Sequence, residues 1–214
     1  MENRDPKPGT QAESSTLHNV STPPRITEAD DALASCKAMR DKAISCPRVQ
    51  FMIEAIEGLG CKLGVPERFI TCAHLDGTKA GGFQVEPGKD PVIYLAAGVG
   101  YGQKQVEQTL THELVHAFDQ CRAHIRFGNL LHHACTEIRA SALSGECDWS
   151  EEVNRGNFAT SAQGEKCVRR RAELSVAMNP ICADKPDPKA TAAAAVSFVF
   201  DKCYFDTAPF YRLP

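Results

Sequence analysis

Hydrophobic residues recur along this chain with a helical period at both ends of the patterned region and with strand-like runs between them. The first helical pattern follows Thr27, which can cap a helix because acidic residues occupy the next positions. A second begins at Pro47, a residue suited to a first helical turn. Residues 1–26 are rich in Pro, Ser, Thr and Asn and have no hydrophobic period, which predicts a disordered tail. We therefore expect a single domain over residues 27–214.

Short strand patterns precede the longest helical pattern. Apolar runs between turn residues predict strands at 69–74, 82–85 and 91–96. Residues 103–122 contain no Gly or Pro and carry apolar residues at helical spacing, so they predict a helix, and His124 is expected to cap its end. Further helices are predicted at 131–143, 163–178 and 190–204. The pattern predicts an α+β fold, mostly helical, with a small sheet before the central helix.

Two histidines one turn apart give that helix its chemistry. His112, Glu113 and His116 form an HExxH pattern, so both imidazoles leave one face of the helix and can bind a single cation such as zinc. Glu113 lies about 100° further round the helix, where it can take a proton from the water that the metal activates. A small sheet ahead of such a helix is the order of a zincin-like metallopeptidase, in which a strand edge can hold an extended peptide.

Catalytic zinc needs a third protein ligand, and the next predicted helix offers one. Glu137 follows a glycine-containing loop that lets this helix turn back against the first, and we predict it as the third ligand. His133, one turn earlier, is an alternative ligand or a donor that stabilises the charged intermediate. Asp119, three residues after His116, is a further alternative, as a ligand or as a partner of a ligand's second ring nitrogen.

Charge and hydropathy limit the possible partners. A formal net charge of −3 gives no general attraction to nucleic acid, and we expect none as a partner. No apolar run reaches the roughly 18 residues that span a bilayer, and the first residues lack the apolar core of a secretory signal. The basic run Arg169–Arg171 is expected on a solvated face, with a membrane-surface or substrate contact as the alternative. Phe205, Phe210 and Tyr211 are candidates for membrane contact.

The 10 cysteines are the second strong signal. They are spread over the patterned region without a CxxC pair, which favours up to five disulfides over a cysteine-ligated metal site. The alternative is a set of reduced, mostly buried thiols. Disulfides require an oxidising compartment, and the mitochondrial intermembrane space combines oxidation with the absence of a secretory signal.

Several longer segments carry a resemblance to a known family. They are HELVHAFD at 112–119, HHACTEIRA at 132–140 with LSGEC at 143–147, and VFDKCY at 199–204 with Pro209 and Phe210. CPRV at 46–49 and GGF at 81–83 belong to the same set, so the match covers roughly residues 33–210. In these segments the chain resembles the mitochondrial inner-membrane metalloproteases that mature an ATP synthase subunit.

The resemblance implies a zinc endopeptidase attached peripherally to the inner membrane, on the intermembrane-space side. It implies removal of the presequence of a membrane-sector ATP synthase subunit, and help in assembling that subunit. The family's metal ligands fall on His112 and His116 and its catalytic acid on Glu113, whereas Glu137 matches the pattern and its liganding is our inference. The alternative is an assembly chaperone or protein-binding factor with little or no proteolytic role, including a Ku-binding role in DNA repair.

Overall fold

Helices and strands follow one another in the order that the hydrophobic pattern predicts. The structure is a computed structural model that describes residues 27–75, 77, 79–86, 88–158 and 163–213, so the predicted tail 1–26 lies outside the described residues. Its elements are α1 (Glu28–Ile44), α2 (Pro47–Gly58), α3 (Pro66–Phe69), β1 (Ile70–Ala73), β2 (Gly81–Gln84), β3 (Val92–Ala96), α4 (Gln103–Ala123), α5 (Leu130–Leu143), α6 (Trp149–Asn154), α7 (Gln163–Ala177), α8 (Pro180–Ala183) and α9 (Pro188–Tyr204). The predicted α+β class is confirmed. The short helices α3, α6 and α8 escaped prediction because one or two turns carry too little periodicity.

Local capping explains where the longer helices begin and end. The Thr27 side chain accepts a hydrogen bond from the backbone N–H of Asp30 and so caps α1, and Asn129 caps α5 in the same way. Pro47 occupies the first turn of α2. The motif helix α4 ends at His124, whose backbone adopts the left-handed conformation with φ of 48°. The predicted role of His124 as a cap is confirmed.

The sheet has three strands in the order β1-β3-β2, with β3 in the centre. β1 is parallel to β3 and β2 is antiparallel to it. Ala80 and Ala96 lie opposite each other, and the backbone N–H of Ala96 donates to the carbonyl of Ala80. Hydrogen-bonded and non-bonded pairs alternate along antiparallel strands, so every second pair after Ala80–Ala96 is also hydrogen-bonded. The intervening residues Gly81 and Phe83 therefore direct their backbone polar groups away from β3. No strand within the described part of the chain pairs with the outer edge of β2, so this edge is suited to receive another strand.

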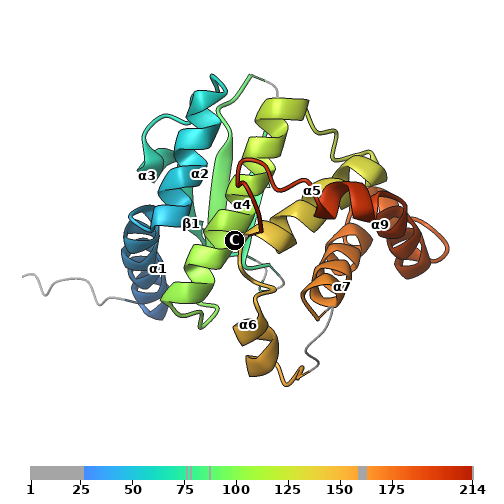
Figure 1. The fold of residues 1–214 in the computed structure, drawn as a ribbon. Helices are drawn as coiled ribbons and strands as arrows, with labels where there is room; N and C mark the ends of the chain where they lie inside the picture. The colour runs from blue at the N-terminus through green and yellow to red at the C-terminus, as the bar shows by residue number, and fades with distance from the viewer. Residues whose placement is uncertain (1–26, 76, 78, 87, 159–162, 214) are drawn as a thin grey trace, which may run out of the picture.

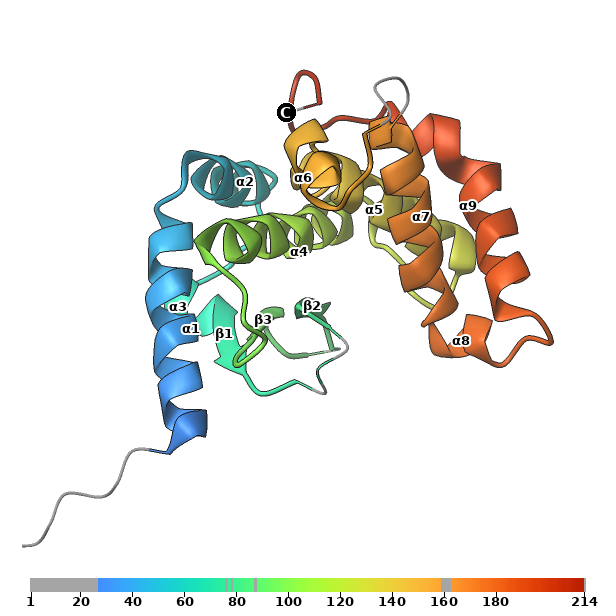
Figure 2. The same ribbon diagram turned by 90° about the horizontal axis from the view of Figure 1, so that it is seen from below.

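Two hydrophobic cores lie on either side of the helix pair α4 and α5. The first joins α1, α2 and the sheet to α4, around residues such as Met52, Ile93 and Leu114. The second joins α5, α7 and α9, around residues such as Ile138 and Phe200. Figures 1 and 2 show the same division: α4 crosses between α2 and the sheet, and α5 leads into the bundle with α7 and α9. The motif helix therefore lies at the boundary between the two cores.

Four disulfides cross-link the fold, Cys36–Cys72, Cys61–Cys121, Cys135–Cys203 and Cys147–Cys167. The prediction of a disulfide framework is confirmed, but a fifth bond does not form. The two remaining thiols belong to different cores, because Cys46 packs against the first and Cys182 lies within the second.

The apolar residues considered for membrane contact divide into two kinds. Phe205 and Tyr211 are exposed. Phe210 is half-buried, and its ring centroid lies 5.0 Å from that of Phe51 on α2, so part of its side chain packs against the first core. Within the described part of the chain, no helix has both the length and the apolar character needed to cross a membrane.

Candidate active site

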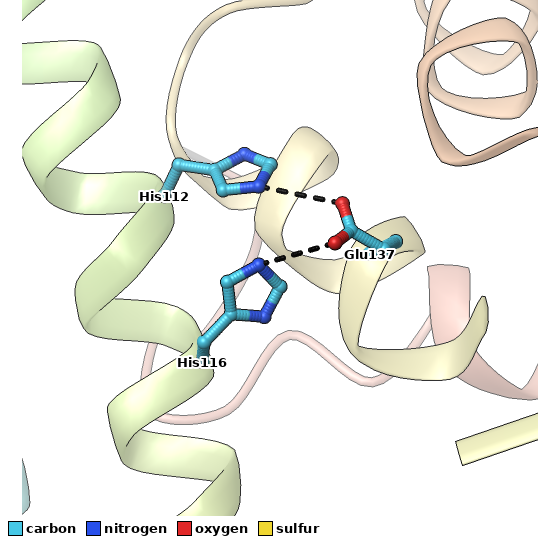
Figure 3. A group of neighbouring side chains, drawn as sticks. All are labelled: His112, His116 and Glu137. Carbon is cyan, nitrogen blue, oxygen red and sulfur yellow. Dashed lines mark ion pairs between the residues drawn. The ribbon is translucent and has the colours of Figure 1, made fainter. Parts of the chain in front are cut away.

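Two histidines and a glutamate from neighbouring helices converge at the boundary between the cores. His112 and His116 lie one turn apart on α4 and face α5, from which Glu137 extends towards them (Figure 3). Nε2 of His112 lies 3.4 Å from Oε2 of Glu137, and Nε2 of His116 lies 3.4 Å from Oε1. One donor atom from each residue lies within 4.8 Å of the other two. The structure thus brings the three predicted ligands together.

This donor set fits zinc. Two imidazoles and one carboxylate hold catalytic zinc with a fourth position left open. The two histidines approach different oxygens of the Glu137 carboxylate, and one donor atom from each of the three residues lies close enough to the other two for a single ion to reach all three. Asp119 is not part of this group among the described residues, because its carboxylate is engaged by Arg122, Arg139 and Thr136.

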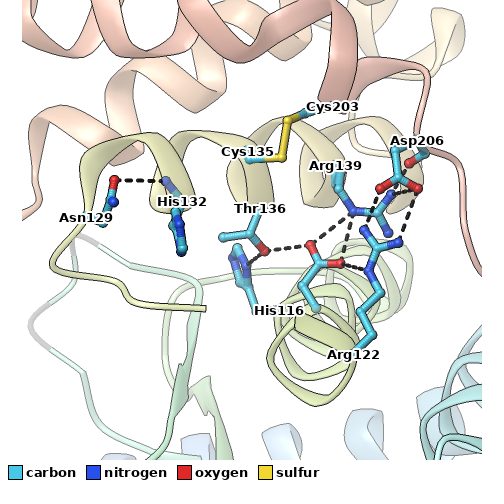
Figure 4. Close-up of a disulfide and its surroundings, with 10 residues drawn as sticks. His116, Arg122, Asn129, His132, Cys135, Thr136, Arg139, Cys203 and Asp206 are labelled. Carbon is cyan, nitrogen blue, oxygen red and sulfur yellow. Dashed lines mark hydrogen bonds and ion pairs between the residues drawn. A yellow bond between two sulfur atoms is a disulfide. The ribbon is translucent and has the colours of Figure 1, made fainter. Parts of the chain in front are cut away.

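Thr136 and Asp119 fix the proton on the His116 ring (Figure 4). Nδ1 of His116 lies 2.9 Å from Oγ1 of Thr136, whose hydroxyl donates to Oδ2 of Asp119 at 2.9 Å. Because the hydroxyl has one proton and gives it to the carboxylate, its oxygen can only accept from Nδ1–H of the imidazole. A neutral His116 therefore presents the lone pair of Nε2, the atom that faces Glu137. Asp119 supports a ligand's second nitrogen, as the sequence allowed, but through Thr136.

Arg139 links the Asp119 carboxylate to a segment that lies far away in the sequence. It is 1% exposed, and its Nε donates to both oxygens of Asp119 at 3.0 Å. Its two terminal nitrogens donate to the backbone carbonyls of Asp206 and Ala208. Arg122 also joins Asp119 to Asp206, through Nε and Nη2. The segment after α9 is therefore bound to the same buried carboxylate that supports His116.

A second carboxylate lies beside His112, close enough for an ion pair but not in hydrogen-bond geometry. Oε1 of Glu146 lies 3.3 Å from Nδ1 of His112, and its other oxygen lies 2.5 Å from Nη2 of Arg171. Burial lowers the pKa of His112, but Glu146 and Glu137 raise it well above its usual range. Burial opposes ionisation of Glu146, yet His112 and Arg171 lower its pKa to about 2. Buried anionic charge thus surrounds the donor set, an environment suited to a cation.

Glu113 lies beside the donor set and against the sheet. A Cβ atom built on Gly81 of β2 would lie 3.3 Å from its Oε1, so the strand passes close to this carboxylate. Burial raises the pKa of Glu113, and the neighbouring histidines lower it by a smaller amount. A carboxylate with a raised pKa is a better proton acceptor than an ordinary one near neutral pH. Its position and basicity agree with the predicted role of general base.

His133 contacts the predicted third ligand from its own helix. Nδ1 of His133 accepts from the amide of Asn179 at 3.0 Å, so a neutral ring carries its proton on Nε2, which lies 3.1 Å from Oε1 of Glu137. The same Asn179 amide donates to the carbonyl of Phe127, whose ring lies edge-on to His116 and His133. The structure therefore places a ring N–H beside Glu137 at the wall of the site.

The donor set, Glu113, His133 and Glu146 line one cleft with a volume of about 470 Å³. β2 lines one side, α4 and α5 provide His112, Glu113, His116, His133 and Glu137, and α7 with the start of α8 lines the other side. Figure 2 shows β2 and the α7–α8 turn on the same side of the α4–α5 pair, with β2 beneath α4 and the turn across from it at the end of α7. A cleft between a strand edge and a helical wall suits an extended chain more than a compact ligand.

The basic run does not form a freely solvated face. The guanidinium of Arg169 lies 3.4 Å above the ring centroid of Phe200, Arg170 pairs with the buried Glu152, and Arg171 pairs with Glu146 at the site. The three side chains remain 34%, 43% and 40% exposed, so the expected solvated face holds in part, but each one also has a partner within the fold.

Sequence reasoning missed most of the supporting residues. Thr136 and Glu146 lie in the segments that carry the resemblance, but neither was given a role. Arg139, Arg171 and Asn179 act through partners far away in the chain, at separations that no local spacing reveals. A charged residue inside an otherwise apolar helical face, as at Arg139, is a signal that could have indicated a buried role.

Comparison with known proteins relates the whole domain to one family. A model of the peptidase M76 family matches residues 34–211. A "mitochondrial inner membrane protease ATP23" of Meyerozyma guilliermondii is 42% identical, over 88% of this chain and 75% of the relative. The protein of that name in Malassezia globosa is 35% identical, over 91% and 85%, and that of Schizosaccharomyces pombe is 36% identical, over 84% and 92%. No solved structure matches the chain.

Proposed function

Because the chain belongs to the peptidase M76 family, we propose that this peptidase is a zinc-dependent endopeptidase with a zincin-like site. The observation that carries the proposal is the meeting of His112, His116 and Glu137 with Glu113 in one cleft. A ligand set of this kind beside a buried carboxylate is what metal-assisted peptide hydrolysis requires. His112, His116 and Glu137 would hold the metal.

We further propose that the enzyme works at the mitochondrial inner membrane, peripherally and on the intermembrane-space side. The names of its relatives support the membrane, and four disulfides support an oxidising compartment. On the resemblance of its sequence, its substrate is the precursor of a membrane-sector ATP synthase subunit, whose presequence it removes and whose assembly it assists.

Each residue of the site then has a defined task. Zinc, when bound, polarises the scissile carbonyl and activates the attacking water. Glu113 takes a proton from that water and passes it to the leaving amine. The Nε2–H of His133 lies 3.1 Å from Oε1 of Glu137, beside the cluster, and would be a donor for the developing oxyanion.

The free edge of β2 is suited to hold the substrate backbone. Gly81 and Phe83 direct their N–H and C=O groups away from β3 at the border of the cleft. An extended peptide paired with these groups would lie beside Glu113, since Gly81 packs against that carboxylate. This arrangement supports cleavage within a chain.

Replacing Glu113 with Gln tests the proposal. The variant should bind about one zinc per chain, measured by elemental analysis, and should fail to cleave a peptide spanning the presequence. Glu107→Gln is the matched control, because Glu107 is a half-buried residue of the same helix outside the cleft. Cleavage that persists in Glu113→Gln would refute the peptidase mechanism. Assembly that proceeds normally in this variant would favour the chaperone role.

The third ligand is tested by the metal content of Glu137→Ala. Zinc present in the wild-type protein and lost from this variant would support Glu137. Zinc retained at wild-type affinity would refute Glu137 as a ligand and return the role to His133.

A further inference from the structure

The helical wall of the cleft carries large apolar side chains that remain exposed. Leu174, in the last turn of α7, and Met178, directly after that helix, are 59% and 54% exposed, and both line the cleft. Ile181 on α8 is 45% exposed and lies against the backbone of the loop before α5, where a Cβ on Gly128 would be 3.3 Å from its Cδ1. Pro180 completes this surface, which we call the apolar wall.

The apolar wall does not belong to either core. The buried face of α7 is a different one, formed by Cys167, Val168, Ala172 and Val176. The rest of the helix is strongly polar and includes the arginine run. Exposing several large apolar side chains beside a catalytic cleft is unfavourable in water unless another molecule covers them.

We propose that the apolar wall is a specificity subsite that binds a large apolar side chain of the peptide substrate. The inference rests on the proposed peptidase function, because the occupant is the chain held on β2. The wall is continuous with the cleft that contains Glu113 and stands opposite the strand edge. Alternate side chains of an extended peptide point to opposite faces, so a peptide paired with β2 directs side chains out of the strand towards the helices.

Charge around the cleft supports an apolar occupant of the wall. Two carboxylates of the cleft are engaged within the fold, Glu137 by His112 and His116 and Glu146 by Arg171, and neither belongs to the apolar wall. Leu174, Met178, Pro180 and Ile181 contain no charged group to pair with an acidic or basic side chain. A charged substrate residue at this position would lose water and gain no partner, whereas Leu, Phe or Met would bury apolar surface.

The test uses a library of extended peptides that differ at one position at a time, with cleavage followed by mass spectrometry. The wild-type enzyme should prefer large apolar residues over Asp or Lys by about 10- to 100-fold in kcat/KM at one position near the scissile bond. The double variant Leu174→Glu/Met178→Glu should lose this preference and accept Lys or Arg there. Phe198→Glu is the matched control, because Phe198 is 79% exposed on α9 and does not line the cleft.

The outcomes separate this inference from the function on which it rests. Absence of cleavage by the wild-type enzyme would refute the peptidase proposal and the subsite with it. Cleavage without an apolar preference, or a preference that survives in the double variant, would refute the subsite alone. Unchanged specificity combined with lost flotation on anionic vesicles would assign the apolar wall to a lipid surface instead.

Discussion

Replacing Thr136 with Val should weaken zinc binding without touching a ligand. Val has nearly the shape of Thr but no hydroxyl, so Nδ1 of His116 loses its acceptor at 2.9 Å and Asp119 loses one of its donors. The carboxylate keeps Arg139 and Arg122 as partners. The imidazole proton is then free to move to Nε2, where it faces Glu137 and must leave before a metal binds.

Two independent estimates give the size of the effect. Leaving one buried polar group without its partner costs about 1–3 kcal/mol. Loss of an outer partner of a metal-bound histidine lowers metal affinity by about 10- to 100-fold, which equals about 1.4–2.8 kcal/mol. Because both ranges coincide, we expect the dissociation constant of zinc to rise by about 10- to 100-fold in Thr136→Val.

Chelator competition measures that dissociation constant directly, and Thr136→Ser is the control. Ser keeps the hydroxyl and loses only a methyl group, so its affinity should stay within a few-fold of the wild-type value. Equal affinities in the wild-type protein and Thr136→Val would refute the role of the hydroxyl. So would a loss of the same size in both variants, because the methyl group would then explain it.

Three further predictions concern strand β2, the loss of stability at acidic pH, and the disulfides. Gly81→Ala should lower stability by about 1–3 kcal/mol and reduce kcat/KM. The added Cβ would lie 2.8 Å from the Thr109 side chain and 2.9 Å from the Tyr94 carbonyl oxygen. A Cβ at Gly82 meets nothing within 4 Å, so Gly82→Ala should resemble the wild-type enzyme. Burial of Glu152 opposes its ionisation, but Arg155, Gln163 and Arg170 lower its pKa from 4.5 to about 2. Its contribution of about 3 kcal/mol is therefore present above pH 4.5 and lost as the pH falls towards 2, and urea unfolding of Glu152→Gln should show a flatter pH dependence over that window. Removing the Cys147–Cys167 disulfide, which joins residues 20 apart in the chain, should lower the free energy of unfolding by about 3 kcal/mol. Removing Cys36–Cys72, which joins residues 36 apart, should lower it by about 4 kcal/mol. Only removal of Cys147–Cys167 should also weaken zinc binding, since this bond lies beside Glu146. Equal zinc affinities in the two variants that each lack one of these disulfides would contradict this reasoning.

The parts of the fold that sequence predicts well are those with local causes. The strand at 91–96 and the helix at 103–122 were placed within one residue of β3 and α4, because an apolar run between turn residues and an uninterrupted helical period are both readable from neighbours. The order β1-β3-β2 was not predictable. The order depends on which strand occupies the centre of the sheet. Packing of the whole sheet against α4 determines this, and the sequence of a single strand does not reveal it.

The candidate site divides in the same way. His112, Glu113 and His116 are related by helical spacing alone, so the sequence reveals them. Glu137 required one further step, the return of the next helix. The residues that contact the two histidines from behind come from α4, α5, α7 and the segment after α9, so no local spacing in the sequence relates them. In the sequence, a charge run such as Arg169–Arg171 also looks the same whether it faces water or a buried partner.

The cysteines connect these two levels. They indicated an oxidising compartment, but two of the bonds also lie directly beside the residues that support the histidines. Cys147 follows Glu146, and its partner Cys167 lies one turn before Arg171, so that bond holds both members of the pair that supports His112. Cys135 precedes Thr136, and its partner Cys203 lies just before the segment bound by Arg139. These two disulfides therefore lie next to residues that contact His112 and His116, so their oxidation would constrain the surroundings of the proposed ligands as well as stabilise the chain.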